Sequence, residues 1–444
     1  MTLNKKISSS NYIFFTNLVF GFFPITFILG NLITNINILL FCFLGIFYLK
    51  SRILEIKFDF PTKIIFIFFL IILFSTTLSF VKSLYYDGYE HDNLLKLVKS
   101  ILFFRFFLML IIVCLLSEFG VLNFKYFFLT AVFSPILISS DIIYQYFFGF
   151  NIIGLEGYFH HNSSFFGDEW IAGGFIQNFS FFSVLFLAFK LKDKKFLKFI
   201  LITSLICLLG VGILFSGNRM PLILFLLGLI IIFFLTKKLK KIIPASFLIL
   251  FIIFWIAGSF DNHIKTSYLS FYSNIKNITV DLEEISTENK SNIKLKEEKK
   301  WLPESNSFKK LILTGIDTWK FNKIFGNGIK SFRDDCIKVN MNKKNRMCAS
   351  HPHNYYIEIL AEIGIIGFII TMIMGVAFIV FLFRNFKFLN DDSQGKLILI
   401  ASITSLILEV FPFKQTGSIF TTNNAAYIIL IASIILSQRK LLNK

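Results

Sequence analysis

The chain contains about twelve apolar runs, most of them long enough to cross the hydrocarbon core of a membrane. A helix of about 20 apolar residues spans this core of about 30 Å, and soluble domains rarely repeat such runs. Because the runs are continuous rather than alternating, they favour helices over membrane strands. We therefore predict an all-α, polytopic integral membrane protein with about twelve transmembrane helices, near residues 12–30, 33–49, 63–82, 94–117, 125–148, 171–189, 196–214, 219–235, 241–258, 363–383, 395–411 and 419–436.

The basic residues predict how these helices are oriented. The net charge is +18, but Lys and Arg gather in alternate connections, such as residues 50–63, 190–198 and 237–241. Basic connections tend to face the cytoplasm, so the pattern indicates a lipid bilayer rather than a nucleic acid as the partner. Both termini are then expected in the cytoplasm. The first run is expected to be an uncleaved helix, because no small-residue cleavage site follows it.

One long connection faces the opposite side in this topology. The chain divides into nine helices at residues 1–258, a large periplasmic loop at residues 259–360 and three helices at residues 361–444. The first half of the loop, residues 274–310, mixes Lys and Glu and is typical of a solvated helix or a flexible segment. The second half contains aromatic residues and glycines and is expected to fold, and long loops with their own structure are usually functional.

A tight turn at residues 216–221 places Arg219 at the outer end of a predicted helix. The positive end of the helix dipole is an unfavourable place for a cation. A bound anion would account for it, because a helix N-terminus, free amides and an arginine together form a phosphate site. The alternative is an arginine that extends to lipid headgroups.

A second cluster precedes the tenth predicted helix. His351 and His353 can titrate near neutrality and are candidates for acid–base chemistry or substrate contact. Glu358 and Glu362 are four residues apart, share a helix face and are expected to hold the start of this helix in place. No cluster of Cys or Asp stands nearby, and His-Pro-His is a poor chelating geometry, so we predict no metal site.

Three further groups are expected on the same outer side. Asp141 lies near the outer end of the fifth predicted helix, where a carboxylate is costly unless it is paired. It is either part of a binding site with Gln145 and Glu169 or the structural partner of a cation on the preceding helix, Arg105 or Lys99.

Lys414 follows the eleventh predicted helix and is either an anion contact or an interfacial cation. Cys336 and Cys348 lie in the outer loop and are either a disulfide or two free thiols, whereas Cys42, Cys114 and Cys207 lie in apolar runs and are expected to be inert.

These motifs carry a family resemblance. Over roughly residues 135–420 the chain resembles the O-antigen ligase and polymerase family of bacterial envelope glycosyltransferases. The most specific match is the signature His353-Asn354-x-Tyr356-Ile357-x-x-Leu360-x-Glu362-x-Gly364-x-x-Gly367. Further matches are Ser216-Gly217-x-Arg219, Asp141-x-x-Tyr144-Gln145, and Phe325-Gly326-Asn327-Gly328-x-x-x-Phe332-Arg333-x-x-Cys336.

The resemblance implies a C-type glycosyltransferase in the bacterial inner membrane, with its active site facing the periplasm. Such enzymes move a glycan from undecaprenyl diphosphate to lipid A-core, as ligases, or to a second lipid-linked glycan, as polymerases, without a nucleotide sugar, a cofactor or a metal. Arg219 would bind the diphosphate, and His353 would act as the base or stabilise the leaving group. Arg333, His351 and Asn354 would contact substrate.

Two questions remain open at the level of sequence. Many members carry another arginine shortly before the loop tryptophan, whereas Gly315-Ile316-Asp317-Thr318-Trp319 has none, and Lys309, Lys310 and Arg333 are candidates to replace it. A transporter or a glycan flippase would also suit twelve spans. These classes predict related halves and ionisable residues near the midplane, whereas the polar clusters here lie at outer ends.

Overall fold

The computed structural model describes residues 2–55, 58–86, 91–157, 161–191, 193–269, 307–340, 346–386 and 394–438. Regular structure in these residues consists of helices, with one isolated bridge between Phe150 and Glu156. The predicted all-α class is therefore confirmed. Most of the Lys- and Glu-rich first half of the long loop lies outside the described residues.

Most of the described residues lie in α-helices. They are α1 (Thr2–Gly21), α2 (Phe23–Leu29), α3 (Asn31–Leu49), α4 (Phe60–Tyr86), α5 (His91–Glu118), α6 (Lys125–Phe148), α7 (Ala172–Lys190), α8 (Lys195–Phe215), α9 (Arg219–Leu235), α10 (Ile242–Phe260), α12 (Ser307–Trp319), α13 (Phe332–Asn340), α14 (Tyr355–Phe386), α15 (Gln394–Glu409) and α16 (Thr422–Ser437), with short 3₁₀ turns η1 (Lys50–Glu55), η2 (Ser164–Phe166) and η3 (Lys237–Leu239).

Eight of these helices are long and apolar enough to cross a membrane. The pair α1 and α2 adds a ninth if it forms one span bent by 46°, and α9 and α16 are shorter apolar helices. The bend lies where the sequence predicted one continuous span. Pro24 explains it, because proline lacks the amide hydrogen of a helix interior and suits the first turn of a new helix. The protein is thus a polytopic membrane protein, and the count of twelve spans stays a prediction.

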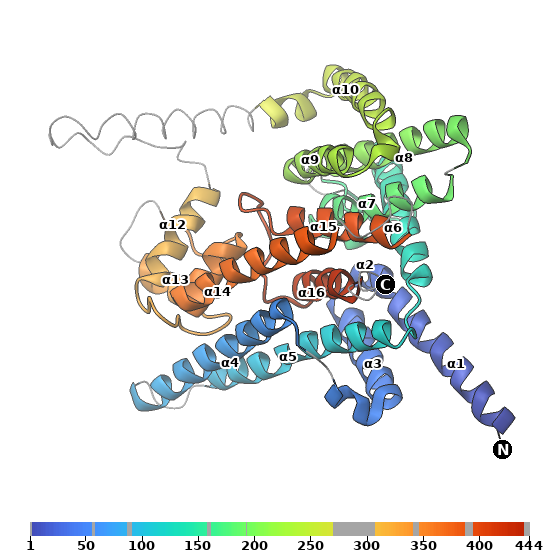
Figure 1. Ribbon diagram of the computed structural model, residues 1–444. Helices are drawn as coiled ribbons and strands as arrows, with labels where there is room; N and C mark the ends of the chain where they lie inside the picture. Colours follow the sequence, from blue (N-terminus) through green and yellow to red (C-terminus); the bar gives the residue numbers. More distant parts are fainter. Residues whose placement is uncertain are drawn as a thin grey trace, which may run out of the picture.

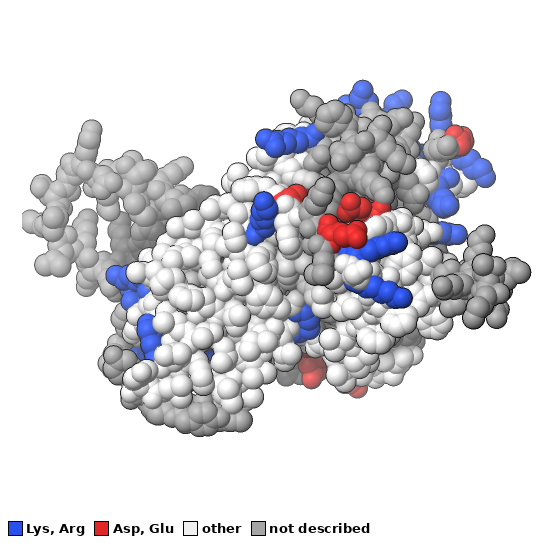
Figure 2. All heavy atoms as spheres, turned by 60° about the horizontal axis from the view of Figure 1, so that its bottom comes forward, with Lys and Arg blue, Asp and Glu red and all other residues white. Residues whose placement is uncertain are grey.

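The helices pack into a single bundle with an apolar outer surface. Figure 1 shows α4 and α5 side by side, with α14 packed on α4 and α16 packed on α5, while α6, α7 and α8 pack on one another. Phenylalanines such as Phe20, Phe106 and Phe179 fill the interior. A broad part of the surface in Figure 2 carries no charged side chain, as expected where lipid covers a protein.

The folded part of the long loop packs on the start of α14. In Figure 1, α12 and α13 lie beside the N-terminal part of α14, and α12 contacts it. Asn354 caps α14, because its Oδ1 accepts hydrogen bonds from the amides of Tyr356 and Ile357 at 3.1 and 3.2 Å. The helix therefore begins at Tyr355, and the predicted boundary between loop and helix at residue 360 lies inside it.

The backbone of α14 breaks at Gly364, and the loop before α13 fills the gap. Gly364 has a φ of 70°. The amide of Ile365 donates to the carbonyl of Lys323 at 2.9 Å, and the amide of Gly328 donates to the carbonyl of Glu362 at 2.8 Å. A Cβ on Gly364 would lie 2.3 Å from the carbonyl oxygen of Ile324, so only glycine fits here.

We predict that Gly364→Ala destabilises the protein by at least about 2 kcal/mol, because it adds left-handed strain and a backbone clash. Thermal unfolding in detergent measures the change. Gly375→Ala in the same helix is the matched control, because open space surrounds that position. Equal stability of the two variants would contradict this account of the break.

Candidate functional site

One cavity of about 670 Å³ collects polar residues from distant parts of the chain. It is lined by parts of the α6–α7 connection, α7, the α8–α9 turn, the segment before α14, the α15–α16 connection and the start of α16. The polar lining residues are His161, Asp168, Trp170, Asn178, Asn218, Arg219, His351, His353, Tyr355, Glu409, Lys414, Gln415, Thr416, Asn423, Asn424 and Tyr427. The arginine turn, the histidine segment and the connection that carries Lys414, all singled out in the sequence, thus contribute to one cavity.

Arg219 enters the cavity from the first position of α9. Gly217, with a φ of 77°, allows the tight turn that places it there. One Nη donates to Ser267 Oγ at 3.2 Å. The guanidinium and the N-terminus of α9 therefore add two positive contributions at this wall.

The α6–α7 connection holds this turn in place. Asn162 donates from its side chain to the carbonyl of Phe215, and Asn218 donates to the carbonyl of Trp170, both at 2.7 Å. His161 Nδ1 lies 3.3 Å from the carbonyl oxygen of Ser216. The three contacts make the connection and the arginine turn one structural unit.

His351 and His353 lie side by side at another part of the lining, with ring centroids 4.1 Å apart. The segment around Thr416 orients His353: the Thr416 amide donates to the His353 carbonyl at 3.0 Å, and His353 Nδ1 lies 3.2 Å from the Thr416 carbonyl oxygen. If Nδ1 carries the proton and donates it to this carbonyl, Nε2 is left as the basic nitrogen.

Both imidazoles are held in the neutral form at pH 7. Burial, with smaller contributions from His353 and Lys330, lowers the pKa of His351 to about 4. Burial also lowers the pKa of His353 below its ordinary value, and the bond to the Thr416 carbonyl opposes this only in part. Neutral His353 can accept a proton, which is what a general base requires.

Buried carboxylates tie the surrounding segments together. Glu358 accepts hydrogen bonds from Ser418 Oγ at 2.5 Å and from the Ile419 amide at 2.8 Å, and so binds α14 to the α15–α16 connection. Glu362 accepts from the amides of Lys330 and Phe332 at 2.6 and 3.3 Å and holds the start of α13. Both contacts fit the structural role predicted for these residues.

Lys414 lies in the cavity as part of a buried ion pair. Its Nζ is 2.5 Å from Glu409 Oε2, and only 7% of the residue is exposed, so it is not an interfacial cation. Glu409 also accepts from Asn178 at 2.9 Å and from the hydroxyl of Tyr355 at 2.7 Å. The sequence interpretation missed Glu409, although a carboxylate in an apolar run is the signal that identified Asp141.

Asp141 and Gln145 are satisfied by their own connection. Asp141 accepts from Ser164 Oγ at 2.5 Å and from the Ile152 amide at 3.0 Å, so the alternative in which it pairs with Arg105 or Lys99 does not hold. Hydrogen bonds replaced the ion pair because the chain folds back over the end of α6. Gln145 donates to the Leu155 carbonyl and accepts from the Ser164 amide. Neither residue is among those that line the cavity, and Asp168 lines it in place of Glu169.

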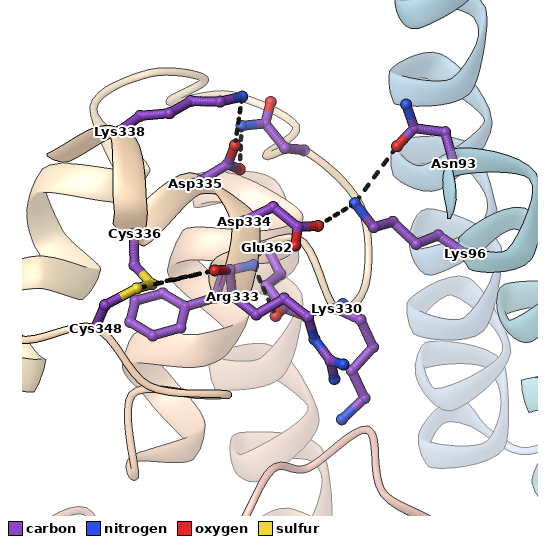
Figure 3. Close-up of polar contacts among 12 residues, drawn as sticks. Asn93, Lys96, Lys330, Arg333, Asp334, Asp335, Cys336, Lys338, Cys348 and Glu362 are labelled. Atoms are coloured by element: carbon purple, nitrogen blue, oxygen red, sulfur yellow. Dashed lines mark hydrogen bonds and ion pairs between the residues drawn. A yellow bond between two sulfur atoms is a disulfide. The ribbon is translucent and has the colours of Figure 1, made fainter. Parts of the chain in front are cut away.

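Arg333 and Asn354 also lie outside the lining. Asn354 donates its side chain to the carbonyl of Pro412 at 2.7 Å and caps α14, so it holds two segments together. Figure 3 shows Arg333 and Lys330 extending into the same space below the start of α13, while Lys96 of α5 pairs with Asp334 at 2.5 Å. Lys309 and Lys310 lie in α12 and, like Arg333, do not line the cavity, so none of these three candidates takes the place of the absent arginine within its lining.

A disulfide joins Cys336 of α13 to Cys348, with Cα atoms 5.4 Å apart (Figure 3). This bond ties α13 to the segment that carries the two histidines. Cys42, Cys114 and Cys207 are not part of a disulfide. Among the described residues, no group of three or more His, Cys, Asp or Glu side chains could hold a metal ion.

Residues 202–372 match the family model described as O-antigen ligase, which confirms the family resemblance of the sequence motifs. No curated protein matches the chain. The matched range includes Arg219, the disulfide and both histidines, and it ends inside α14. Over this range, which is less than half of the chain, this multi-pass membrane protein is similar to O-antigen ligases, and glycan transfer of the ligase or polymerase type is the activity that the similarity supports.

The disulfide predicts a defined count of reactive thiols. Maleimide–polyethylene glycol should label three cysteines in the denatured, unreduced protein and five after reduction, because the chain has five cysteines of which two are paired. Gel mobility gives the count. Five labels before reduction would show that the pair is not formed, and Cys336→Ser/Cys348→Ser serves as the reference with three labels under both conditions.

Proposed function

We propose that this O-antigen ligase-type protein transfers a glycan from undecaprenyl diphosphate to a sugar of lipid A-core at the periplasmic face of the inner membrane. The observation that carries the proposal is a single cavity lined by both Arg219 and His353. One residue supplies a fixed cation and the other a neutral base, and both lie within the matched domain.

The leaving group explains the need for Arg219. Diphosphate departs readily once its charge is neutralised, and the charge develops as the bond between the anomeric carbon and the phosphate oxygen breaks. A preorganised guanidinium at a helix N-terminus stabilises this charge best in a partly dry site.

The acceptor explains the need for His353. A sugar hydroxyl is a weak nucleophile, and Nε2 of the neutral ring accepts its proton as the new bond to the anomeric carbon forms. The electron pair of the broken bond leaves with the diphosphate. This scheme describes a C-type glycosyltransferase in which no step requires a nucleotide sugar or a metal.

The positive-inside pattern supports the proposed side of the membrane. The Lys-rich connections at residues 190–198 and 237–241 precede α8 and α10, whereas the α8–α9 turn in the cavity lies at the opposite end of α8. The cavity then faces the periplasm, the termini face the cytoplasm, and residues 259–360 form the periplasmic loop between the two sets of helices.

We predict that Arg219→Ala and His353→Ala each reduce transfer by at least about 100-fold, since each removes one electrostatic or acid–base contribution of that size. The assay follows transfer in proteoliposomes, with insertion checked by detergent extraction. Arg384→Ala at the far end of α14 is the charge-matched control and should remain active. Near-normal activity of either site variant would remove that residue from the mechanism.

We also predict a pH dependence with a defined sign. The base form of His353 is required and its pKa is lowered from 6.5, so transfer should be constant above about pH 7 and fall in acid as the ring is protonated. Initial rates between pH 4.5 and 8.5 test this. A rate that rises on acidification would exclude His353 as the base.

Deletion of the gene distinguishes the two acceptors. Loss of a ligase should leave long chains on the lipid carrier and none on the core, whereas loss of a polymerase should leave single repeat units on the core. Gel electrophoresis of surface polysaccharide and extracted carrier lipid separates these products. Unchanged polysaccharide in every fraction would exclude both activities.

A further inference from the structure

A stacked aromatic pair lies on the wall of the cavity outside the matched domain. The rings of His161 and Trp170 are nearly parallel, with centroids 4.1 Å apart and an interplanar angle of 14°. Both residues line the cavity, and Trp170 is 50% exposed. The imidazole supports one face of an indole that is otherwise largely open.

The position of this pair is fixed relative to Arg219. Asn218, the neighbour of Arg219, donates to the Trp170 carbonyl at 2.7 Å, and His161 Nδ1 lies 3.3 Å from the Ser216 carbonyl oxygen. A Cβ on Gly173 would lie 2.5 Å from Ser216 Oγ, so the connection and the turn are in close contact. A group attached to an anion at Arg219 therefore lies near the indole.

A flat, supported indole with a carboxylate beside it suits one chemical class in particular. The apolar C–H face of a pyranose stacks on an aromatic ring, and carboxylate oxygens accept hydrogen bonds from its hydroxyls. Asp168, two residues before Trp170, also lines the cavity. An isoprenoid chain would fit the ring but has no hydroxyl to donate to the carboxylate.

Unpartnered acceptors around the cavity indicate the same class. Asn178 donates its amide group to Glu409, which identifies Oδ1 as its free atom, and this buried oxygen has no hydrogen-bond partner. The buried Asn423 Oδ1 and Thr416 Oγ1 also have none. All three residues line the cavity. Diphosphate offers only acceptors and cannot satisfy a carbonyl oxygen, whereas sugar hydroxyls can donate to it.

We propose that Trp170, supported by His161 and flanked by Asp168, is the binding platform for the sugar joined directly to the diphosphate of the donor. The proposal rests on the proposed function, in that Arg219 holds the diphosphate. In this proposal the α6–α7 connection recognises the first sugar, whereas Arg219 binds the diphosphate.

The rival explanation is that Trp170 is only an interfacial anchor, because tryptophan is common at membrane surfaces. Trp255 of α10 tests this alternative. It is 70% exposed, it does not line the cavity, and it serves as a matched control for losing an exposed indole.

Fluorescence measures binding at Trp170 directly. The chain has four tryptophans, so Trp255→Phe/Trp301→Phe/Trp319→Phe leaves Trp170 alone. The probes are lipid-linked glycan extracted from cells that lack this gene, and undecaprenyl diphosphate without a glycan. We expect intact lipid-linked glycan to shift and quench the emission and undecaprenyl diphosphate to leave it nearly unchanged. Equal responses to the two lipids, or no response to the intact lipid, would overturn the proposal.

Kinetics separate the platform from a general structural effect. Trp170→Ala should raise the KM for lipid-linked glycan about three- to tenfold, the size of one aromatic contact, with a smaller change in kcat. Trp170→Phe should recover most of the loss, and Trp255→Ala should resemble the wild type. Equal KM values for Trp170→Ala and Trp255→Ala would refute the platform. A separate measurement tests the proposed function. If undecaprenyl diphosphate competes with substrate in the wild type but not in Arg219→Ala, Arg219 still binds the diphosphate, and the proposed function stands even if the Trp170 platform is refuted.

Discussion

Three buried carboxylates hold the cavity together. Glu358, Glu362 and Glu409 are 1%, 0% and 4% exposed, and each accepts hydrogen bonds from a segment distant in sequence. A carboxylate without partners is costly in a membrane helix, so these contacts fix where the loop, α14 and the α15–α16 connection meet. The segments that carry the histidines and Lys414 are positioned by them.

The cavity wall has two parts with different origins. Arg219 belongs to a turn that is held by the α6–α7 connection, whereas His353 belongs to a segment that is tied down by α13, the disulfide and Thr416. The proposed cation for the leaving group and the proposed base for the nucleophile thus come from separate structural units. The proposed sugar platform lies on the arginine side, as a donor bound through its diphosphate requires.

The helices could be predicted from the sequence, whereas the interaction partners of the buried polar residues could not. Apolar runs predicted the helices, because hydropathy is a local property, although the bend between α1 and α2 came from Pro24. Asp141 was expected either to line a binding site or to pair with a cation, but Ser164 and the Ile152 amide satisfy it. Lys414 was expected to be open to an anion or to the interface, but Glu409 pairs with it. In each case the residue type indicated that a polar partner is needed, but the sequence did not show which residue that partner is.

The sequence by itself determined the helical class and the membrane setting, and it predicted the family resemblance and the residues of the proposed anion clamp and base. Tertiary structure decided which of these meet. Arg219, His351, His353 and Lys414 line the cavity, whereas Arg333, Asn354, Asp141, Gln145 and Glu169 do not, and His161, Trp170 and Glu409 join them. The physical reason is that hydropathy and turn preference act over a few residues, whereas the convergence of side chains depends on how helices far apart in sequence pack.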